Sequence, residues 1–270
     1  MNPPNPQIAA VVDVILKKAR YREIQPGLIE TLAAEELAKG RKLKDAIKAV
    51  SAKLHQAGAA YFAVQIDYRT WMDEVAKLPN DINNPRVKAF CLEHMQVHSS
   101  TQERLPTIEE FFNTTLASIT PVHSVLDLAC GLNPLALPWV PLAGKALYYG
   151  YDIFGDMTGF LNQFINHFGI EGSFKTSDIT RLHFPRRAQV AFLLKTLPCL
   201  EQLDKGISPH LLDAVPADCL LISYPIRSLG GRTKGMGKTY EAQFNKLMEG
   251  RNWSVERFEF KTELAFLVKK

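Results

Sequence analysis

Apolar residues recur at helical spacing through the first third of the chain. Pro26 and the region around Gly40 separate neighbouring sets, as helix breakers do. The sets lie at about residues 8–16, 28–37, 43–54, 67–78 and 85–97. This pattern predicts an all-helical N-terminal domain over residues 1–105.

From about residue 122 the pattern changes to short β-rich runs that alternate with helical segments. Such alternation predicts a parallel sheet with crossover helices, and the last two runs are close enough to pair antiparallel. We therefore expect an α/β fold over residues 106–270, a seven-stranded Rossmann-like domain of the type found in methyltransferases that use S-adenosylmethionine (SAM). The expected strands are 122–128, 146–151, 172–176, 190–194, 219–224, 254–260 and 264–268.

The composition is that of a globular protein, with 270 residues, 46% hydrophobic and 22% charged, which excludes disordered and fibrous classes. A formal charge of +4 permits an anionic partner. The four cysteines are scattered without a C-x-x-C pair, which argues against a zinc ribbon or a disulfide framework and favours a reducing cytoplasm. Because no secretory signal and no long apolar run is visible, we expect no membrane association. His94 and His98 lack the H-E-x-x-H order, so we also expect no metal.

The strand at 122–128 leads into a turn of small residues that contains Ala129 and Gly131. In a doubly wound sheet the ligand lies outside the carboxyl ends of the strands, where a glycine lets the backbone approach it closely. This turn departs from G-x-G-x-x-G, which disfavours an oxidoreductase that uses a dinucleotide. Taken alone, the turn could equally be a simple connection between a strand and a helix.

Acidic residues follow the next two strands. Asp152 ends the second strand, where a carboxylate can accept hydrogen bonds from both hydroxyls of a ribose. Asp178 follows the third strand and can accept from an adenine amino group, while Ile179 packs against the ring. Either Asp could instead cap a helix. Three such signals at consecutive strand ends favour a cofactor that contains a nucleoside.

Three motifs give the chain a closer resemblance. Residues 98–104 read HSSTQER, residues 127–137 read DLACGLNPLAL, and residues 227–236 read RSLGGRTKGM. With these motifs and the helical N-terminal domain, nearly the whole chain resembles the 16S rRNA (guanine-N7) methyltransferases of the Arm, Rmt and Sgm group. Those enzymes modify the decoding site and make bacteria resistant to aminoglycosides.

The resemblance implies a set of contacts with SAM. Arg104 would pair with the SAM carboxylate, Asp152 would bind the ribose, and Tyr61 would add an aromatic contact from the N-terminal domain. A glutamine of the family is displaced by one position at Gln202, so that contact is not carried over. The implied cofactor residues are Tyr61, His98, Ser99, Ser100, Thr101, Arg104, Ala129, Gly131, Asp152, Asp178, Ile179 and Leu194.

Methylation at guanine N7 needs no general base, because N7 has an available lone pair and no proton. Positioning and electrostatics then carry most of the catalysis. The resemblance implies catalytic positions for Lys195 and Arg232, which we expect to hold phosphates and the flipped-out base in line with the methyl group.

Basic residues cluster in the predicted N-terminal helices and in the last motif. A solvated helix face would explain any single one of them, but the clustering favours contacts with rRNA phosphates, which dock a substrate without reading its sequence. We therefore expect a monomer whose partner is the 30S ribosomal subunit and its 16S rRNA. The candidate RNA-binding residues are Lys17, Lys18, Arg20, Arg41, Lys42, Arg227 and Lys234.

Three alternatives remain open at this stage. The chain could be an inactive RNA-binding or ribosome-assembly factor of the same fold, an adenine-N1 rRNA methyltransferase, or a SAM enzyme that acts on a small molecule. SAM affinity tests the first alternative, and mapping of the methylated base tests the other two.

Overall fold

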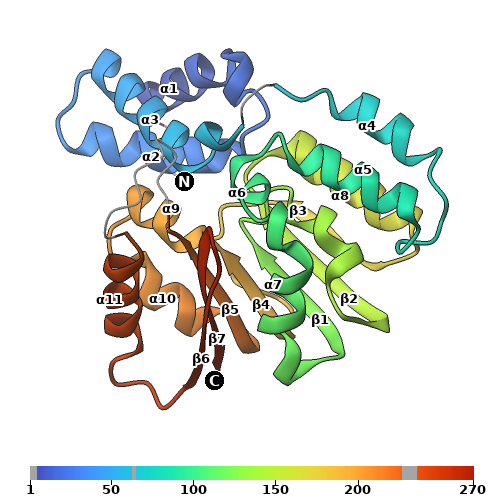
Figure 1. The fold of residues 1–270 in the computed structure, drawn as a ribbon. Helices are drawn as coiled ribbons and strands as arrows, with labels where there is room; N and C mark the ends of the chain where they lie inside the picture. Colours follow the sequence, from blue (N-terminus) through green and yellow to red (C-terminus); the bar gives the residue numbers. More distant parts are fainter. Residues whose placement is uncertain (1–4, 63–64, 227–235) are drawn as a thin grey trace.

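The computed structural model describes residues 5–62, 65–226 and 236–270. Within them a seven-stranded sheet has the order β3-β2-β1-β4-β5-β7-β6, as Figure 1 shows. Strands β1 to β5 are parallel, and β7 is antiparallel to both β5 and β6. The strands are β1 Val122–Leu128, β2 Leu142–Asp152, β3 Glu171–Thr176, β4 Ala188–Leu194, β5 Ala217–Pro225, β6 Ser254–Glu259 and β7 Glu263–Lys269.

The predicted fold class is confirmed, including the antiparallel pair at the end of the chain. The largest difference is at β2, which begins at Leu142, before the expected start at residue 146. Leu142 pairs with Val122, and the register then shifts before Ser124 pairs with Leu147. The residues of this extension are partly or fully exposed, so they carry no apolar signal.

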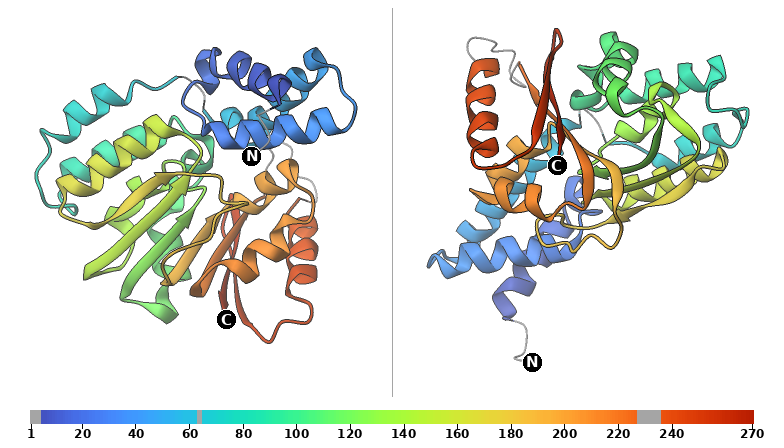
Figure 2. Two further views of the ribbon diagram at one scale, coloured as in Figure 1. Left: turned by 180° about the vertical axis from the view of Figure 1, so that it is seen from behind. Right: turned by 90° about the horizontal axis from the view of Figure 1, so that it is seen from below.

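Three helices form a separate unit beside the sheet (Figure 2). They are α1 Pro6–Leu16, α2 Pro26–Ala38 and α3 Leu43–Ala57. Both α1 and α2 begin with Pro at the first position, and the side chains of Asn5 and Gln25 cap their N-termini. Gly40, with a φ of 77°, follows α2 in the left-handed conformation that glycine tolerates best. Buried residues such as Ile15, Leu32 and Val50 form the core of this unit.

The next helices pack on the sheet domain. They are α4 Tyr68–Val75, α5 Pro85–Met95, α6 Ser99–Gln102 and α7 Ile108–Thr115. The ring of Tyr68 stacks on Phe160 of α8 (Gly155–His167), and Phe90 of α5 stacks on Phe164. The division at residue 105 stays a prediction, but this packing favours an end of the helical unit near residue 62.

Helices cover both faces of the sheet, as Figure 1 shows. Neighbouring residues of one strand belong to different cores, one on each face. Val125 and Phe192 belong to the core that includes α5, α7 and α8. Leu126 and Leu193 belong to the core that includes α9 Thr196–Leu203, α10 Ile207–Ala214 and α11 Met236–Met248. The carboxyl ends of β1, β2 and β4 lie between these layers. Short 3-10 helices lie at Ala19–Tyr21, Ala59–Tyr61, Leu105–Thr107, Ala117–Ile119 and Asn133–Trp139.

The α-helices in the described residues are between 4 and 15 residues long. None of those in residues 5–62, 65–226 and 236–270 is long and apolar enough to cross a membrane.

We predict that Gly150→Ala destabilises the protein by about 1–3 kcal/mol, the usual range for an overpacked core. An added Cβ would lie 2.4 Å from Cδ1 of Phe174 on the neighbouring strand. Urea unfolding measures the loss. Gly144→Ala, on the same strand, is the control, because its Cβ would meet no atom within 4 Å. Equal stability of the two variants would contradict the close approach of β2 and β3.

Candidate active site

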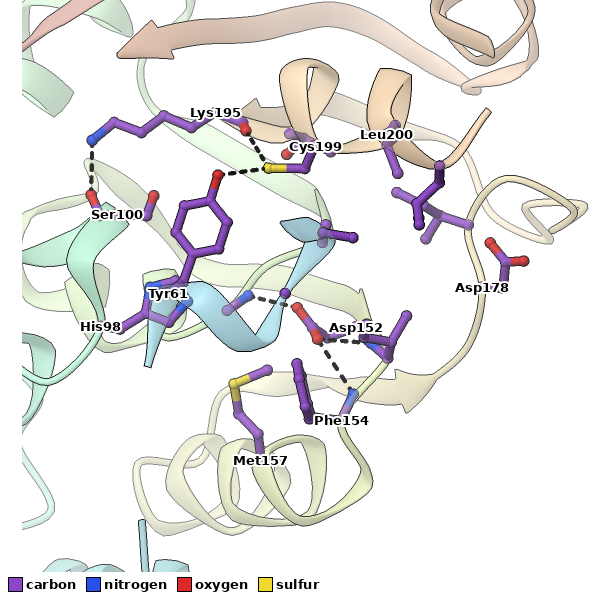
Figure 3. Close-up of a pocket in the computed structure, with 18 of the residues that line it drawn as sticks. Tyr61, His98, Ser100, Asp152, Phe154, Met157, Asp178, Lys195, Cys199 and Leu200 are labelled. Carbon is purple, nitrogen blue, oxygen red and sulfur yellow. Dashed lines mark hydrogen bonds between the residues drawn. The ribbon is translucent and has the colours of Figure 1, made fainter. Parts of the chain in front are cut away.

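A pocket of about 730 Å³, which includes the open space at its mouth, lies at the carboxyl ends of the central strands. Leu28 and Gly58, from the N-terminal helical unit, form part of its wall opposite the sheet. Figure 3 shows this cavity with the side chains around it. The predicted site residues that line it are Tyr61, His98, Ser100, Ala129, Gly131, Asp152, Asp178, Ile179, Leu194 and Lys195.

Asp152 connects the ends of the first two strands. Its Oδ2 accepts the backbone N–H of Gly131 at 2.9 Å, and its Oδ1 accepts that of Ile153 at 2.7 Å (Figure 3). Burial raises the pKa of Asp152 to about 6, although these backbone hydrogen bonds oppose the shift. The carboxylate therefore fixes the turn after β1 and still presents acceptor capacity to the cavity.

Two non-glycine residues at the strand ends have left-handed backbones. Ala129 follows β1 with a φ of 52°, and Lys195 follows β4 with a φ of 59°. Such conformations are uncommon outside glycine and cluster at functional sites. Gly131 is also left-handed, and a Cβ there would lie 3.0 Å from Cε1 of His98. The small-residue turn thus brings backbone and imidazole together at one end of the cavity.

His98 is the clearest sign that this cavity receives a ligand. Its side chain is buried, with 9% of its surface exposed, and its ring stacks on Tyr61 at 5.7 Å between centroids. Nδ1 has no hydrogen-bond partner among the described residues. Burial lowers the pKa of His98 to about 3, so the ring is neutral at physiological pH. Because buried polar groups are nearly always paired, a bound molecule would satisfy this atom.

Asp178 forms a local turn as well as lining the cavity. Its Oδ1 accepts hydrogen bonds from the backbone N–H and the hydroxyl of Thr180, at 2.9 and 2.7 Å. Oδ2 has no partner in the described parts of the chain. One oxygen thus holds the turn, and the other is available to a ligand beside Ile179.

Three predicted cofactor residues do not line the cavity. Ser99 Oγ donates to the carbonyl of Tyr61 at 3.3 Å, and Thr101 Oγ1 donates to that of Met95 at 2.7 Å. Both hold the segment that carries His98 and Ser100. The third residue, Arg104, lies deeper.

Arg104 has only 1% of its surface exposed. Its Nε and Nη2 donate to the two carboxylate oxygens of Glu263 at 3.0 and 2.6 Å, and Nη1 donates to Asn133 Oδ1 at 2.9 Å. The bidentate partner of Arg104 in this structure is therefore a residue of β7. Contact with a SAM carboxylate stays a prediction, and it would use the N–H groups that Glu263 and Asn133 leave free.

Lys195 is buried, with 3% of its surface exposed. Its Nζ donates to Glu103 Oε2 at 2.6 Å. The same Nζ donates to the carbonyl of Ser100 at 3.0 Å, as Figure 3 shows. Its role in holding phosphates stays a prediction, which would require Nζ to exchange these partners. Sequence reasoning missed Cys199, whose Sγ lies 2.9 Å from the Tyr61 hydroxyl. Only its position one turn after the fourth strand could have indicated it.

The basic candidates lie mostly on the helical unit. Lys17 pairs with Asp13, Lys18 donates to Ser51 Oγ, and Arg20 lies 3.4 Å from His55 Nδ1. Arg41 donates through Nε to the buried Glu36, and Lys42 is exposed at the start of α3. Their contacts with RNA stay predictions. Arg227, Arg232 and Lys234 lie outside the described residues.

The sheet order, the antiparallel β7 and a cavity at the carboxyl ends of β1, β2 and β4 define a methyltransferase of the seven-stranded class. A family model described as ribosomal RNA methyltransferase (FmrO) matches residues 17–267. The chain belongs to this family.

Individual relatives match over nearly the whole length. The chain is 30% identical over 269 residues to the 16S rRNA (guanine(1405)-N(7))-methyltransferase of Micromonospora echinospora, covering 99% of this chain and 98% of the relative. It is 31% identical to the enzyme of the same name from Frankia casuarinae, covering 96% and 93%. The crystal structure of the 16S rRNA methyltransferase RmtF in complex with S-adenosyl-L-homocysteine is similar, with a TM-score of 0.82, 29% identity, and 98% and 99% of the two chains covered.

We predict a pH signature for the buried Asp152. Because its folded pKa is raised to about 6 from 3.8, its contribution to stability is present at low pH and is lost as the pH rises through about 6. Relative to Asp152→Asn, the wild-type protein should lose on the order of 2 kcal/mol of unfolding free energy between about pH 4 and pH 6.5. Denaturant unfolding across this range measures the difference, and parallel curves for the two proteins would contradict the raised pKa.

Proposed function

We propose that this protein transfers a methyl group from SAM to N7 of a guanine in 16S rRNA of the 30S subunit, at the decoding site that its relatives modify, and so confers aminoglycoside resistance. The cavity at the carboxyl ends of β1, β2 and β4 carries the proposal, because it places Asp152 and Asp178 in the same pocket as a buried imidazole whose Nδ1 has no partner among the described residues. The names of the full-length relatives support the choice of base and atom. Such an enzyme would act in the cytoplasm, where 30S subunits are.

The residues around the cavity fit SAM. Asp152 lies where a carboxylate can accept from the ribose hydroxyls, and Asp178 with Ile179 offers an acceptor and an apolar surface for adenine. Gly131 leaves the backbone open beside His98, whose Nδ1 lacks a partner in the described structure. SAM supplies a methyl group that is activated by its positive sulfonium. The chain then needs only to bind SAM and the base, to orient them and to exclude water.

The protonation states beside the cavity suit a transfer without a base. His98 is neutral with a pKa near 3, and burial together with Cys199 raises the pKa of Tyr61 well above its usual value. Neither group changes its charge between pH 6 and 9. Because guanine N7 has no proton to lose, these groups can act by shape and fixed dipoles alone, and the rate depends on how well the base is aligned.

Incubation of purified 30S subunits with this protein and labelled SAM tests the function directly. We expect one methyl group per subunit, in 16S rRNA, and strand cleavage at the modified guanine after borohydride and aniline treatment, because N7-methylation gives the ring a positive charge. Subunits treated without the protein are the control. Label at adenine N1 without cleavage would replace the proposal with the adenine alternative, and absence of label despite SAM binding would favour a non-catalytic RNA-binding factor.

The N-terminal helical unit should dock the substrate through its cations. Replacing Lys17, Lys18 and Arg20 together by Glu should weaken binding to 30S subunits and lower its salt dependence, because fewer counterions are released. SAM affinity should stay unchanged, since none of the three lines the cavity. Filter binding at several salt concentrations measures the slope. Replacing Lys145, Arg187 and Lys246 together by Glu is the matched control, because they lie in the first half of β2, just before β4 and near the end of α11, away from the carboxyl-end edge of the sheet. An unaltered slope in the first variant would show that its cations are only a solvated helix face.

A further inference from the structure

Glu263 is the centre of a buried charged cluster that borders the cavity. Besides its two bonds with Arg104, it accepts a hydrogen bond from the Ser223 hydroxyl, and its Oε2 lies 4.0 Å from Lys195 Nζ. Only 1% of its surface is exposed. Lys195 lines the cavity, so only its side chain separates the Glu263 carboxylate from the cavity. No motif in the sequence marks Glu263.

The cluster balances its charges. Two cations, Arg104 and Lys195, face two carboxylates, Glu263 and Glu103. Burial by itself raises the pKa of Glu263, but the charges of Arg104 and Lys195 outweigh burial and hold this pKa below its usual value. Glu263 therefore carries a full negative charge at neutral pH. Asp127 is a poorer source of charge, because burial raises its pKa to about 7.

The charge of Glu263 matters because the cofactor differs in charge at one atom before and after the methyl transfer. SAM carries a sulfonium, an ammonium and a carboxylate, whereas S-adenosylhomocysteine (SAH) has a neutral sulfur after the methyl group has left. A negative charge near this atom stabilises SAM but leaves SAH almost unaffected. In a poorly solvated site such a charge acts over several ångströms.

We propose that Glu263 is a specificity-determining residue that makes the cavity favour SAM over SAH. It acts through Lys195, which lines the cavity, and through Arg104 behind it, because it offsets the positive charges of both. Without this offset, two buried cations would repel the positive cofactor and retain the neutral product. The inference rests on the proposed use of SAM. It assigns β7, which carries Glu263, a role in the exchange of SAH for SAM.

Calorimetry with Glu263→Gln tests the inference without any turnover. The amide has nearly the same volume and can still accept from Arg104, but it lacks the charge. We expect SAM affinity to fall by about five- to tenfold, while SAH affinity changes by less than about twofold or increases. The readout is the ratio of the two dissociation constants, which a merely structural role would not change. The melting temperature, measured in parallel, reports on folding.

Glu259→Gln is the matched control, because Glu259 lies in the same hairpin and is exposed beside Arg257. Its ratio should equal that of the wild type. An equal loss of SAM and SAH affinity in Glu263→Gln, or no loss of either, would overturn the inference. Failure of the wild-type protein to bind SAM would instead remove the proposed cofactor.

Glu103→Gln keeps the inference testable if Glu263→Gln does not fold. Glu103 pairs with the same Lys195 but is partly exposed, so its loss should be tolerated. Water screens the charge of Glu103 better than that of Glu263. We therefore expect SAM affinity to fall by about two- to fourfold relative to SAH affinity. An unchanged ratio in this variant would then overturn the inference.

Discussion

The ion pair between Arg104 and Glu263 is the interaction on which the site depends. Each side chain has 1% of its surface exposed, and burying such charges costs several kcal/mol per ion unless hydrogen bonds satisfy them. Here Asn133 and Ser223 supply the additional bonds. The pair joins the segment just before α7 to the first residue of β7, 159 residues later. Removing either partner would leave the other charge buried without a counter-charge. The ion pair therefore holds the two segments in one arrangement at the border of the cavity.

From this pair a chain of hydrogen bonds runs beneath the cavity. Asn133 donates to Asp127 Oδ2 at 2.8 Å, and the Tyr148 hydroxyl donates to the same oxygen at 2.6 Å. The bonds therefore connect β7 with β1 and β2 under the turn that contains Ala129 and Gly131. Left-handed backbones persist only where their surroundings over-determine them. A satisfied polar network provides that constraint, because no member can move without leaving a buried group unpaired.

The sequence predicts the parts of the site that arise from local pattern. Short β-rich runs between helical segments identified all seven strands of the described sheet. The carboxyl ends of parallel strands meet at one edge, so Gly131, Asp152 and Asp178 could be placed together beforehand. Glu263 could not be found, since a glutamate in a short hairpin resembles any exposed turn residue and its partners lie on distant elements. Likewise, helical spacing shows that α4 has a buried face but not that α8 covers it.

The helical unit and the cofactor cavity share a wall, and this has an energetic consequence. Backbone bonds join the unit to the end of β2: Gln25 N–H donates to the Ile153 carbonyl at 2.8 Å, and Gly155 N–H donates to the Glu23 carbonyl at 2.7 Å. These bonds flank Asp152, which lines the cavity and is the proposed ribose contact. A ligand that touches both walls stabilises the arrangement in which they meet. Since linkage is reciprocal, a substrate that held the helical unit in this arrangement would also strengthen ligand binding in the cavity.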